Sequence, residues 1–531
     1  MTVLAARPWH AAWPAHLPHA LDYPSVPAWW LLERNLPRYG DRVAIREVDH
    51  ETLAERRALT YAALGRAARG AATGLAGLGA GPGTRVGLCL PNGVALVVGY
   101  YATWWAGATV VPANPTARAG EVEQQLGDAG VALVVGQPGG AGAVAAEALK
   151  VPFLDVAAFA AMERLRPAAA AACAPEDDVA VLLYTGGTTG TPKGAMLTHR
   201  NIVANTIQFA EWYAFAPGEE TSISAIPCFH SGGMSGVMNV PLYAAATLVV
   251  FPRFRPAAVA EACGRYGVTR LFGVPTMYIA LLNDAAGRAA DYRHLRACRT
   301  NAAPLPPAVK AAFDRLVGRE VLVEGYGLTE TSPLTHANPI HRPKPGSIGI
   351  PLPDTDARIV DLATGEDVTP GESGELLVRG PQVMKGYWNR PEETAEAMAG
   401  GWLRTGDVAT MDGEGYFAVV DRKKDMINTA GFKVWPREVE EVLYGHDAVK
   451  LAVVVGVPDD YRGEAVKAFV VLKDGCRAAP EELVAHCRAR LSHYKVPRAV
   501  EFRTELPTSG AGKLLRRALR ETSTSNQGGS A

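Results

Sequence analysis

Short apolar runs alternate with longer alanine-rich stretches along most of the chain. The runs RVGLCL, ALVVG, VAVLLY, TLVVF and RLFGV have the length and composition of strands that are buried on both faces. The stretches between them, such as TYAALGRAARGAATGLAGLG, space their apolar residues as one face of a helix does. Strands that alternate with helices predict parallel sheets covered by helices. An α/β fold is therefore expected from about Thr60 onward, with helix and loop over the alanine-rich residues 139–174.

The uncharged stretch over residues 88–117 needs a separate interpretation. By hydropathy alone it could span a bilayer. Its glycine and proline positions instead favour a buried helix over 93–106, a helix stop at Gly107, and a short strand over 108–111 that ends at Pro112. We therefore expect a helix followed by a strand inside the protein.

The pattern changes after about Arg342. ARIVD, GELLVRG and GYFAVVD are short alternating strands between turn formers, which predicts a smaller antiparallel unit. After Asp421, the charged stretch DRKKDMINTAGFKVWP precedes a helix that starts at Pro436, the strands LAVVVGV and AVKAFVVL, and a helix over 480–491. A second domain should therefore begin near Lys424, and the polar tail TSTSNQGGSA should be disordered.

Composition and charge exclude several classes of protein. The chain has 531 residues, of which 48% are hydrophobic, and its 53 basic and 54 acidic residues give a net charge of −1. Intrinsic disorder of the whole chain is excluded, and so is a broad basic surface for nucleic acid. The seven cysteines are scattered without a C-x-x-C pair, which favours a reducing cytoplasm over a disulfide scaffold or a zinc site. The N-terminal residues show no secretory signal, so a cytoplasmic protein is expected.

A loop of glycine and threonine follows the predicted strand VLLY. Glycines let backbone N–H groups approach an anion, threonine hydroxyls add donors, and a lysine adds positive charge. This chemistry suits a triphosphate, although Pro192 before the lysine rules out a Walker A loop. The alternative is a flexible hairpin. The candidate residues are Thr185, Gly186, Gly187, Thr188, Thr189, Gly190 and Lys193.

Two further segments carry polar residues suited to a nucleotide. In VEGYGLTETSP, Tyr326 offers a face on which a base could stack, Thr329 a phosphate donor, and Glu330 a hard oxygen ligand for Mg²⁺. In GWLRTGDVATMDGEGYFAVVDRKK, the carboxylate of Asp407 could accept two ribose hydroxyls, and Arg422 could reach the same sugar or a phosphate. Each segment taken singly could be an ordinary turn.

A fourth segment, LPTSGAGKLLRRALR, places Lys513 on a glycine-rich loop. Such a loop presents a mobile cation away from any helix. The alternative is a solvated basic tail, and we favour that interpretation for Arg516, Arg517 and Arg520.

Taken together, these segments resemble the acyl-adenylate-forming enzymes, which include acyl-CoA synthetases, firefly luciferase and stand-alone adenylation domains. YTGGTTGTPKG, YGLTET, TGD, DRKKDMI and the closing GK occur in the order and spacing of that family, over about residues 60–520. The opening RPWHAAWP, the run SGELLVRGPQVMKGYWNRPEET and the stretch YKVPRAVEFRTELPTSGAGKLLRRALRE look most like bacterial long-chain fatty-acid–CoA ligases.

The resemblance implies a fold, a division into domains and a set of co-substrates. The fold is α/β, with a large N-terminal domain of two parallel-type sheets with helices plus a small β-rich unit, and a smaller mobile α+β C-terminal domain. The implied boundaries are 1–421 for the adenylate-forming domain, 422–424 for a hinge, 425–520 for the mobile domain and 521–531 for a disordered tail. ATP, Mg²⁺ and coenzyme A are the implied cofactor and co-substrates, and a small carboxylic acid is the substrate.

The resemblance also implies roles for single residues. The loop from Thr185 to Lys193 matches the phosphate loop, Asp407 and Arg422 the ribose contacts, and Tyr326 the adenine-stacking ring. The remaining matches are Ala302 and Ala303 for adenine contact, Thr329 for the α-phosphate, Glu330 for Mg²⁺, Lys513 for the lysine that bridges carboxylate and α-phosphate, His230 for the acyl pocket and thioester tunnel, Lys424 for the hinge, and Gly431 for the loop on the coenzyme A side. In this chain Asn301 stands where relatives have Gly or Ser before the alanines.

The predicted activity is activation of a medium- to long-chain fatty acid through acyl-AMP to acyl-CoA. An aryl- or other carboxylate–CoA ligase is the alternative within the family. A serine hydrolase, suggested by HSGG at His230, is disfavoured because the chain has no G-x-S-x-G elbow. A non-catalytic nucleotide-binding module is disfavoured because both Glu330 and Lys513 are present. The sequence leaves peripheral membrane contact and homodimer formation open.

Overall fold

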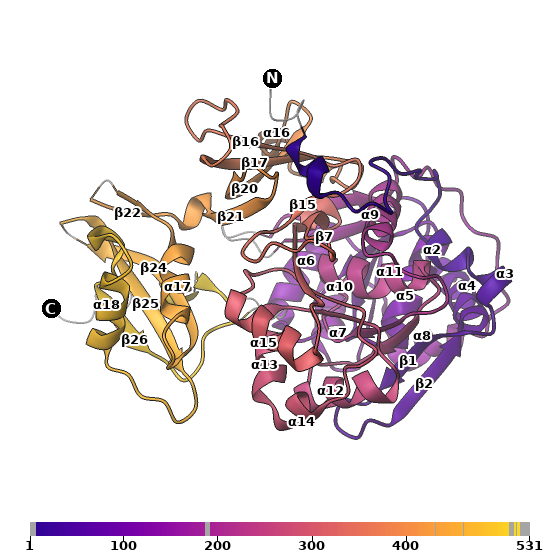
Figure 1. Ribbon diagram of the computed structural model, residues 1–531. Helices are drawn as coiled ribbons and strands as arrows, with labels where there is room; N and C mark the ends of the chain where they lie inside the picture. Colours follow the sequence, from indigo (N-terminus) through magenta and orange to yellow (C-terminus); the bar gives the residue numbers. More distant parts are fainter. Residues whose placement is uncertain are drawn as a thin grey trace. The chain divides into compact units, whose positions relative to one another are not determined.

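A computed structural model describes residues 7–185, 192–430, 432–459, 461–508, 514–516 and 518–520 (Figure 1). The chain divides into two compact units, and neither unit is a single continuous segment. The larger unit consists of Trp9–Asp356 and Val378–Leu403. The smaller unit contains Ala357–Leu377 and the chain from Arg404 onward.

A seven-stranded sheet of the larger unit has the order β18-β8-β7-β4-β3-β5-β6. Its strands from β7 to β6 pair in parallel, whereas β8 pairs antiparallel with both β7 and β18. The predicted strands RVGLCL, ALVVG and VAVLLY are β3, β5 and β7. The bounds are β3 Arg85–Cys89, β4 Thr109–Pro112, β5 Leu133–Gly136, β6 Phe153–Asp155, β7 Val179–Tyr184, β8 Gly194–Thr198 and β18 Gly386–Tyr387.

A nine-stranded sheet of the same unit has the order β15-β14-β13-β12-β11-β9-β10-β1-β2. Its central strands, from β13 to β1, pair in parallel, and antiparallel pairs close both edges. The bounds are β1 Val43–Val48, β2 Glu55–Thr60, β9 Thr221–Ser224, β10 Thr247–Val250, β11 Arg270–Gly273, β12 Ala297–Thr300, β13 Leu322–Gly327, β14 Leu334–Ala337 and β15 Ile350–Pro351. The predicted strands TLVVF and RLFGV are β10 and β11, so the two predicted parallel sheets are confirmed.

Helices connect and cover these strands. The helices that precede β7 are η1 Pro8–Ala12, α2 Trp30–Glu33, α3 Leu36–Tyr39, α4 Tyr61–Gly77, α5 Val94–Trp105, α6 Ala119–Ala129, α7 Ala141–Leu149 and α8 Val156–Met162. The later helices are α9 His199–Trp212, α10 Ser231–Met234, η2 Ser235–Asn239, α11 Val240–Tyr243, α12 Pro256–Arg265, α13 Pro275–Asn283, α14 Ala285–Ala289, α15 Pro307–Val317, η3 Thr329–Thr331 and α16 Pro391–Ala397.

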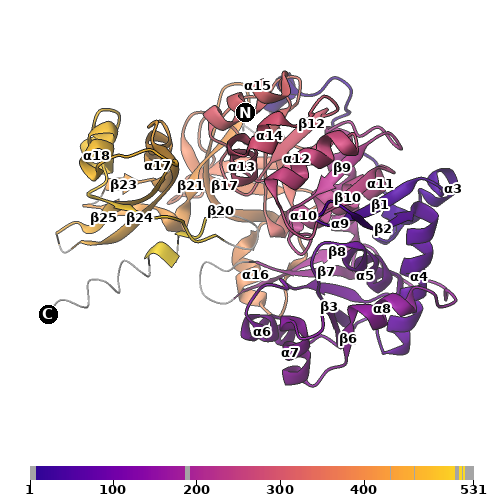
Figure 2. The same ribbon diagram turned by 90° about the horizontal axis from the view of Figure 1, so that it is seen from below.

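The uncharged stretch forms α5 and β4, as the glycine and proline positions predict. Helix α5 packs against α4 and α8, and nearly all of its residues are buried (Figure 2). Burial on all sides explains why the helix is apolar all round. Among the described residues, no helix is long and apolar enough to cross a membrane. Residues 139–174 contain the predicted helices, α7 and α8, and also the three-residue strand β6, which the sequence analysis missed.

A third sheet has the order β16-β17-β20-β19, and β21 pairs with β20. The predicted alternating strands ARIVD, GELLVRG and GYFAVVD are β16, β17 and β21. Strand β20 pairs antiparallel with β19 and β21, as expected for a smaller antiparallel unit. The bounds are β16 Asp356–Val360, β17 Ser373–Arg379, β19 Met398–Ala399, β20 Trp402–Met411 and β21 Phe417–Arg422.

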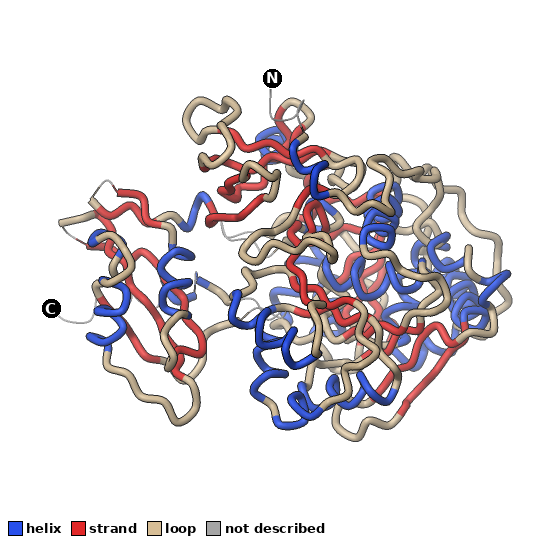
Figure 3. The backbone as a smooth tube through the Cα atoms, viewed as in Figure 1, coloured by secondary structure: helices blue, strands red, loops and turns tan. Residues whose placement is uncertain are grey.

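The C-terminal sheet has the order β23-β22-β25-β24, and β26 pairs with β25 (Figure 3). Side chains of α17, α18 and the sheet form one core, whereas Leu506 and Leu519 belong to a second cluster with β24 and β25. Helix α18 ends at Arg488, three residues before the predicted end, although Leu491 still packs against the same core. The bounds are η4 Lys423–Asp425, β22 Ile427–Thr429, β23 Phe432–Val434, α17 Pro436–Tyr444, β24 Val449–Asp459, β25 Gly463–Leu472, α18 Pro480–Arg488, η5 His493–Lys495 and β26 Ala499–Phe502.

Candidate active site

The two ends of the glycine–threonine loop meet at the end of a hairpin. Tyr184, the last residue of β7, pairs with Gly194, the first residue of β8. The backbone N–H of Thr185 donates to the carbonyl oxygen of Lys193 at 2.9 Å. The structure therefore closes the loop at its base. Gly186, Gly187, Thr188, Thr189 and Gly190 lie outside the described residues.

Tyr387 links Lys193 to Glu330. It lies on β18, opposite Ala195 of β8, and the Nζ of Lys193 is 5.2 Å from the centroid of its ring. Its hydroxyl donates to Oε1 of Glu330 at 2.8 Å. Burial and the neighbouring Glu330 carboxylate raise the pKa of Tyr387, which keeps the phenol protonated as a donor. The predicted phosphate-loop lysine and the predicted Mg²⁺ ligand therefore share one neighbour.

The sequence analysis gave Tyr387 no role. The residue lies in the run SGELLVRGPQVMKGYWNRPEET, which supported the resemblance only as a whole. Its place depends on the pairing of the two-residue strand β18 with β8, across nearly two hundred positions of sequence. A strand of two residues carries no usable alternation of apolar and polar positions.

Tyr326, Thr329 and Glu330 follow one another at the end of a central strand. Tyr326 is near the end of β13, and its ring lies edge-on to His336 of β14 at 6.0 Å between centroids. Thr329 and Glu330 begin the single turn η3, and the N–H of Met384 donates to the carbonyl oxygen of Glu330 at 2.8 Å. Ligands of open α/β sheets bind outside the carboxyl ends of strands, which is where these residues lie.

The predicted adenine stretch leaves the neighbouring strand at the same edge. Strands β12 and β13 are parallel, with Thr300 beside Glu324. Ala302 lies two residues after Thr300, just as Tyr326 lies two residues after Glu324, so the two segments leave the sheet at the same edge. Ala302 is exposed and has a φ of +71°. Asn301 is buried, and its Oδ1 has no hydrogen-bond partner.

His230 precedes a helix that runs through α10, η2 and α11. Its ring is tilted against Phe229, at 4.8 Å between centroids, and its Nε2 is buried without a hydrogen-bond partner. Burial lowers the pKa of His230 to about 4, so the ring is neutral at physiological pH. Farther along this helix, the hydroxyl of Ser235 donates to the carbonyl oxygen of Ser332 at 2.5 Å. This bond holds the helix beside the η3 segment that contains Glu330.

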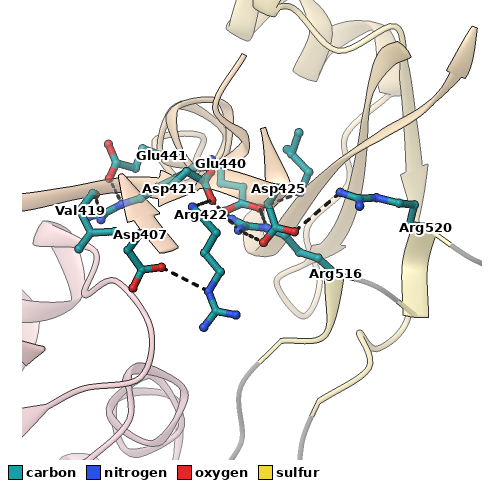
Figure 4. A network of polar contacts seen from close by, with 11 residues as sticks. Asp407, Val419, Asp421, Arg422, Asp425, Glu440, Glu441, Arg516 and Arg520 are labelled. Atoms are coloured by element: carbon teal, nitrogen blue, oxygen red, sulfur yellow. Dashed lines mark hydrogen bonds and ion pairs between the residues drawn. The ribbon is translucent and has the colours of Figure 1, made fainter. Parts of the chain in front are cut away.

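Asp407 and Arg422 lie opposite each other in the smaller unit. They are register partners in β20 and β21, and Arg422 Nε is 3.6 Å from Asp407 Oδ1 (Figure 4). The N–H of Asp407 donates to Oγ1 of Thr405 at 3.1 Å, across Gly406, which has a φ of +71°. One carboxylate and one guanidinium can thus present themselves together to a polyol. Lys424 follows on the single turn η4.

Arg516 corrects one prediction of the sequence analysis. It was expected in a solvated basic tail, yet its Nη1 is 3.0 Å from Oδ1 of Asp421 and its Nη2 is 2.7 Å from Oε2 of Glu440 (Figure 4). A longer contact of 3.6 Å reaches Asp425. Burial raises the pKa of Glu440, although Arg516 opposes that shift. The arginine therefore compensates buried carboxylates, and only their positions in the fold show this.

Two further predicted residues lie outside the described part of the chain, and the others divide between the two units. Lys513 and Gly431 lie outside the described residues. Thr185, Lys193, His230, Ala302, Ala303, Tyr326, Thr329 and Glu330 belong to the larger unit, whereas Asp407, Arg422 and Lys424 belong to the smaller one.

The residues around Glu330 fit one mode of magnesium binding, in which the protein supplies a single carboxylate. Over the part of the chain that the structure describes, no group of three or more His, Cys, Asp or Glu side chains could hold a metal by itself. Mg²⁺ usually keeps several waters and binds through one or two carboxylates together with substrate phosphates. A single half-buried carboxylate that shares the neighbour Tyr387 with Lys193 is compatible with that mode of binding.

Comparison with known proteins defines the class of enzyme. The family model described as AMP-binding enzyme matches residues 32–388, and the model of the AMP-binding enzyme C-terminal domain matches residues 438–513. The chain belongs to the AMP-binding enzyme family and is an AMP-forming acid–thiol ligase.

Its relatives include enzymes for alkyl and aryl acids. The chain is 40% identical to a long-chain-fatty-acid–CoA ligase of Bacillus subtilis over 98% of this chain and 99% of that protein. It is 42% identical to a feruloyl-CoA synthase of Amycolatopsis over 87% and 94% of the two chains. Among solved structures, ATP-bound MatB from Rhodopseudomonas palustris is 31% identical with a TM-score of 0.83, covering 94% of this chain and 99% of that chain. An anthranilate CoA ligase in complex with anthranoyl-AMP is 28% identical with a TM-score of 0.86, covering 95% and 98%.

Proposed function

We propose that the protein is an ATP-dependent acyl-CoA synthetase that activates a medium- to long-chain fatty acid through acyl-AMP. The products are acyl-CoA, AMP and pyrophosphate. The observation that carries the proposal is the contact of Tyr387 with both Lys193 and Glu330 at the end of the phosphate-loop hairpin. It joins a cation for phosphate and a carboxylate for Mg²⁺ in a chain of the AMP-binding enzyme family.

In the first step, a carboxylate oxygen of the acid attacks the α-phosphorus of ATP. The bond from that phosphorus to the bridging oxygen breaks, and pyrophosphate leaves. Two anions must approach each other, so catalysis depends on positioning and on fixed positive charge. Lys193 and the glycine–threonine loop would hold the phosphates, Thr329 the α-phosphate, and Lys513 the carboxylate against it. Glu330 would hold Mg²⁺, which neutralises charge on the phosphates.

In the second step, the thiol of coenzyme A attacks the acyl carbon, the bond from that carbon to the phosphate oxygen breaks, and AMP leaves. The thiol proton is released to solvent. His230, which is neutral at physiological pH because burial lowers its pKa to about 4, would border the thiol path without adding charge to it. Tyr326, Ala302 and Ala303 would hold the adenine throughout.

We further propose that the small domain changes orientation between the two steps. Lys513 is needed in the first step, whereas the loop at Gly431 would take part in the second. A hinge over 422–424, at Lys424, would move residues 425–520 against residues 1–421. Asp407 and Arg422 would keep the ribose in place during that motion.

The choice of a fatty acid rests on the relatives that match nearly the whole chain. Long-chain-fatty-acid–CoA ligases of Bacillus subtilis and Yersinia pestis are 40% and 38% identical over 98% and 97% of this chain. An aryl-CoA ligase is the second candidate, because the feruloyl-CoA synthase is 42% identical over 87% of the chain.

Replacing Lys513 with alanine tests the proposed mechanism. We expect acid-dependent pyrophosphate release to fall by about 10²–10³, as for the loss of one transition-state donor. The thioester step from preformed acyl-AMP should be largely spared. Lys473→Ala, at an exposed lysine that directly follows β25, is the matched control and should preserve both steps. Equal loss in both half-reactions of the Lys513 variant would contradict the assignment.

A substrate panel separates the two candidate functions. Coenzyme A-dependent AMP formation would be measured with fatty acids from acetate to stearate and with benzoates and cinnamates. Highest kcat/KM for medium- or long-chain fatty acids supports the proposal. A preference for the aromatic acids supports the second candidate, and AMP formation with none of them contradicts both.

A further inference from the structure

A buried arginine in the larger unit lacks a counter-ion. Arg299 lies on β12, is 4% exposed, and its guanidinium carbon is 3.8 Å and 3.9 Å from the ring centroids of Phe209 and Phe272. Its Nε, Nη1 and Nη2 atoms are all buried without a hydrogen-bond partner. Within the described parts of the chain, Arg299 makes no ion pair. By contrast, Arg270 on neighbouring β11 is also buried, and its Nη2 is 2.7 Å from Oε1 of Glu220.

The guanidinium of Arg299 still carries its charge. Burial lowers its pKa to about 10, and the nearby Tyr213 opposes that shift, so the group is protonated at neutral pH. Contact with aromatic rings stabilises a cation, but the N–H donors of a guanidinium still need acceptors. A buried charge without a partner is unfavourable, and buried charges in proteins are paired. The partner of Arg299 is therefore to be sought outside the chain.

Arg299 lies against the helix that follows His230, the predicted acyl-pocket residue. A Cβ atom at Gly236 would lie 3.1 Å from Arg299 Nη2 and 2.8 Å from Phe272 Cε1, so the helix that follows His230 passes directly against the guanidinium. Its neighbour Ser235 donates to Ser332, two residues after Glu330. Arg299 thus contacts the helix that follows His230, the predicted acyl-pocket residue. The same helix is hydrogen-bonded to the segment that contains Glu330, the predicted Mg²⁺ ligand.

Helix geometry gives an approximate distance between His230 and the part of the helix that contacts Arg299. Gly236 follows His230 by six residues, which corresponds to a rise of roughly 9 Å along a helix. A group bound by Arg299 would therefore lie well away from the carboxylate that is activated. Only the far end of an extended acid could reach it.

We propose that the acid carries a second carboxylate at its far end, and that Arg299 binds this carboxylate. The preferred substrates are then α,ω-dicarboxylic acids. The inference rests on the proposed function, because it assumes an acyl-CoA synthetase. A guanidinium presents a planar fork that pairs with a carboxylate through two parallel hydrogen bonds. A hydroxyl or a phenol would leave the positive charge uncompensated.

Tyr213 supplies a second donor for the same group. Its ring centroid is 5.6 Å from the guanidinium carbon, and its hydroxyl is also buried without a hydrogen-bond partner. Burial raises the pKa of Tyr213 to about 12, so the hydroxyl remains a donor at neutral pH. The phenol also interacts with the guanidinium itself, but it is neutral and leaves the positive charge of Arg299 uncompensated. A buried cation with no acid beside it among the described residues therefore suits an anion.

The test compares diacids with monoacids of equal length. We would measure kcat/KM for coenzyme A-dependent AMP formation with the series from hexanedioate to tetradecanedioate and with the matching monoacids. We expect the best diacid to exceed its monoacid by about 10- to 100-fold, the value of a charge-assisted hydrogen bond. Arg299→Met should abolish this preference and improve the monoacid. Arg299→Lys, which keeps the charge and loses the fork, should give an intermediate ratio.

Arg270→Met is the matched control, because it removes a buried arginine from the next strand. Its diacid-to-monoacid ratio should equal that of the unchanged enzyme, and an equal change in both variants would overturn the proposal. A preference for monoacids at every length, unaltered by Arg299→Met, would also overturn it while leaving the proposed function intact. AMP formation with neither series would contradict the proposed function itself. If Arg299→Met fails to fold, the ratios of the unchanged enzyme and of Arg299→Lys decide.

Discussion

Tyr387 positions two charged side chains through two different kinds of contact. Its hydroxyl donates to the Glu330 carboxylate, and its ring faces the ammonium group of Lys193. The first contact fixes the direction of a carboxylate that we assign to Mg²⁺, and the second keeps the lysine near it. Tyr387 touches neither the acid nor the reacting phosphorus in the proposed mechanism, so we regard it as a positioning residue.

Replacing Tyr387 with phenylalanine separates these two contacts. The ring beside Lys193 remains, whereas Glu330 loses its donor. Loss of a group that orients a metal ligand typically costs 10- to 100-fold in metal affinity. We therefore expect the Mg²⁺ concentration for half-maximal activity to rise by about 10-fold or more, with KM for coenzyme A unchanged.

Tyr23→Phe is the matched control for that variant. The hydroxyl of Tyr23 donates to Oδ2 of Asp354 at 2.7 Å, in a tyrosine–carboxylate pair that contains no predicted site residue. Its Mg²⁺ dependence should be that of the unchanged enzyme. If Tyr387→Phe responds to Mg²⁺ as the control does, the hydroxyl has no part in orienting a metal ligand.

At the residue scale, the sequence indicates which residue types suit a nucleotide, but it does not predict which side chains they contact. Asp407 and Arg422 could be selected because a carboxylate and a guanidinium suit a ribose, and the structure makes them register partners. Arg516 was wrongly assigned to a solvated tail and Tyr387 was given no role, because the contacts of both depend on distant segments. The sequence also gave no reason to select Arg299, since a single arginine in a buried strand does not show whether an acidic side chain pairs with it.

At the element scale, the helix that runs from α10 to α11 is fitted closely to its surroundings through glycines. A Cβ atom at Gly233 would lie 2.0 Å from the carbonyl oxygen of Pro227, which is backbone and cannot turn away. At Gly232 the nearest atom to such a Cβ is 3.8 Å away. Two adjacent glycines of one helix therefore have opposite tolerance for a methyl group.

Alanine substitutions at these two glycines should differ in sign. Gly233→Ala should lower the free energy of unfolding by about 3 kcal/mol or more, because overpacking against backbone forces a shift of the helix start. Gly232→Ala should raise it by about 0.5–1 kcal/mol, because alanine is the better helix former. Urea unfolding of both variants, followed by tryptophan fluorescence, measures the difference. Equal stability would show that the helix start is not held where we describe it.

Parallel strands with unbroken apolar runs were the elements most readily predicted, whereas the parallel strands β9 and β12, which contain Ser, Thr or Arg, were not. The predicted strands are buried on both faces and read as unbroken apolar runs, as in β3 and β7. The short strands β6 and β18 were missed, because two or three residues fix no periodicity. The early end of α18 shows the usual limit on helix boundaries, since Leu491 remains on the same core after the helix has ended.

At the scale of the whole molecule, stability should depend on buried neutral histidines. His199 is 3% exposed, and its Nδ1 accepts a hydrogen bond from the N–H of Ala28 at 2.9 Å. A protonated ring could not accept that bond. Burial therefore lowers the pKa of His199 from 6.5 to about 4, against a weaker opposing effect of Asp178.

The sign of the pH dependence follows from where the proton binds. Above pH 6.5 the ring is neutral in both states, and between pH 6.5 and about pH 4 only the unfolded chain binds the proton. The free energy of unfolding should therefore fall by about 1.4 kcal/mol per pH unit through this histidine as the pH decreases. Urea unfolding across that range should show a slope reduced by this amount in His199→Asn. An unchanged slope would mean that the ring is protonated in the folded protein.

The division into two units was the least predictable feature. Both units consist of segments that are separate in sequence. The short segment Ala357–Leu377, for example, belongs to the same unit as the chain from Arg404 onward. Apolar patterning indicates that such a segment forms strands, but not which distant strands it pairs with. The change in composition predicts a second domain that begins near Lys424, and the family resemblance implies a boundary at 421. Both remain predictions.

The sheet order has a consequence for synthesis on the ribosome. Ile45 of β1 pairs with Leu248 of β10, so roughly 200 residues must be translated before an early strand meets its parallel neighbour. At about 5–20 residues per second, the emerging chain would wait on the order of 10–40 s with that edge of β1 unpaired. Nascent chains of this protein should accordingly be clients of ribosome-associated chaperones, and slow codons before position 248 should raise the fraction that aggregates.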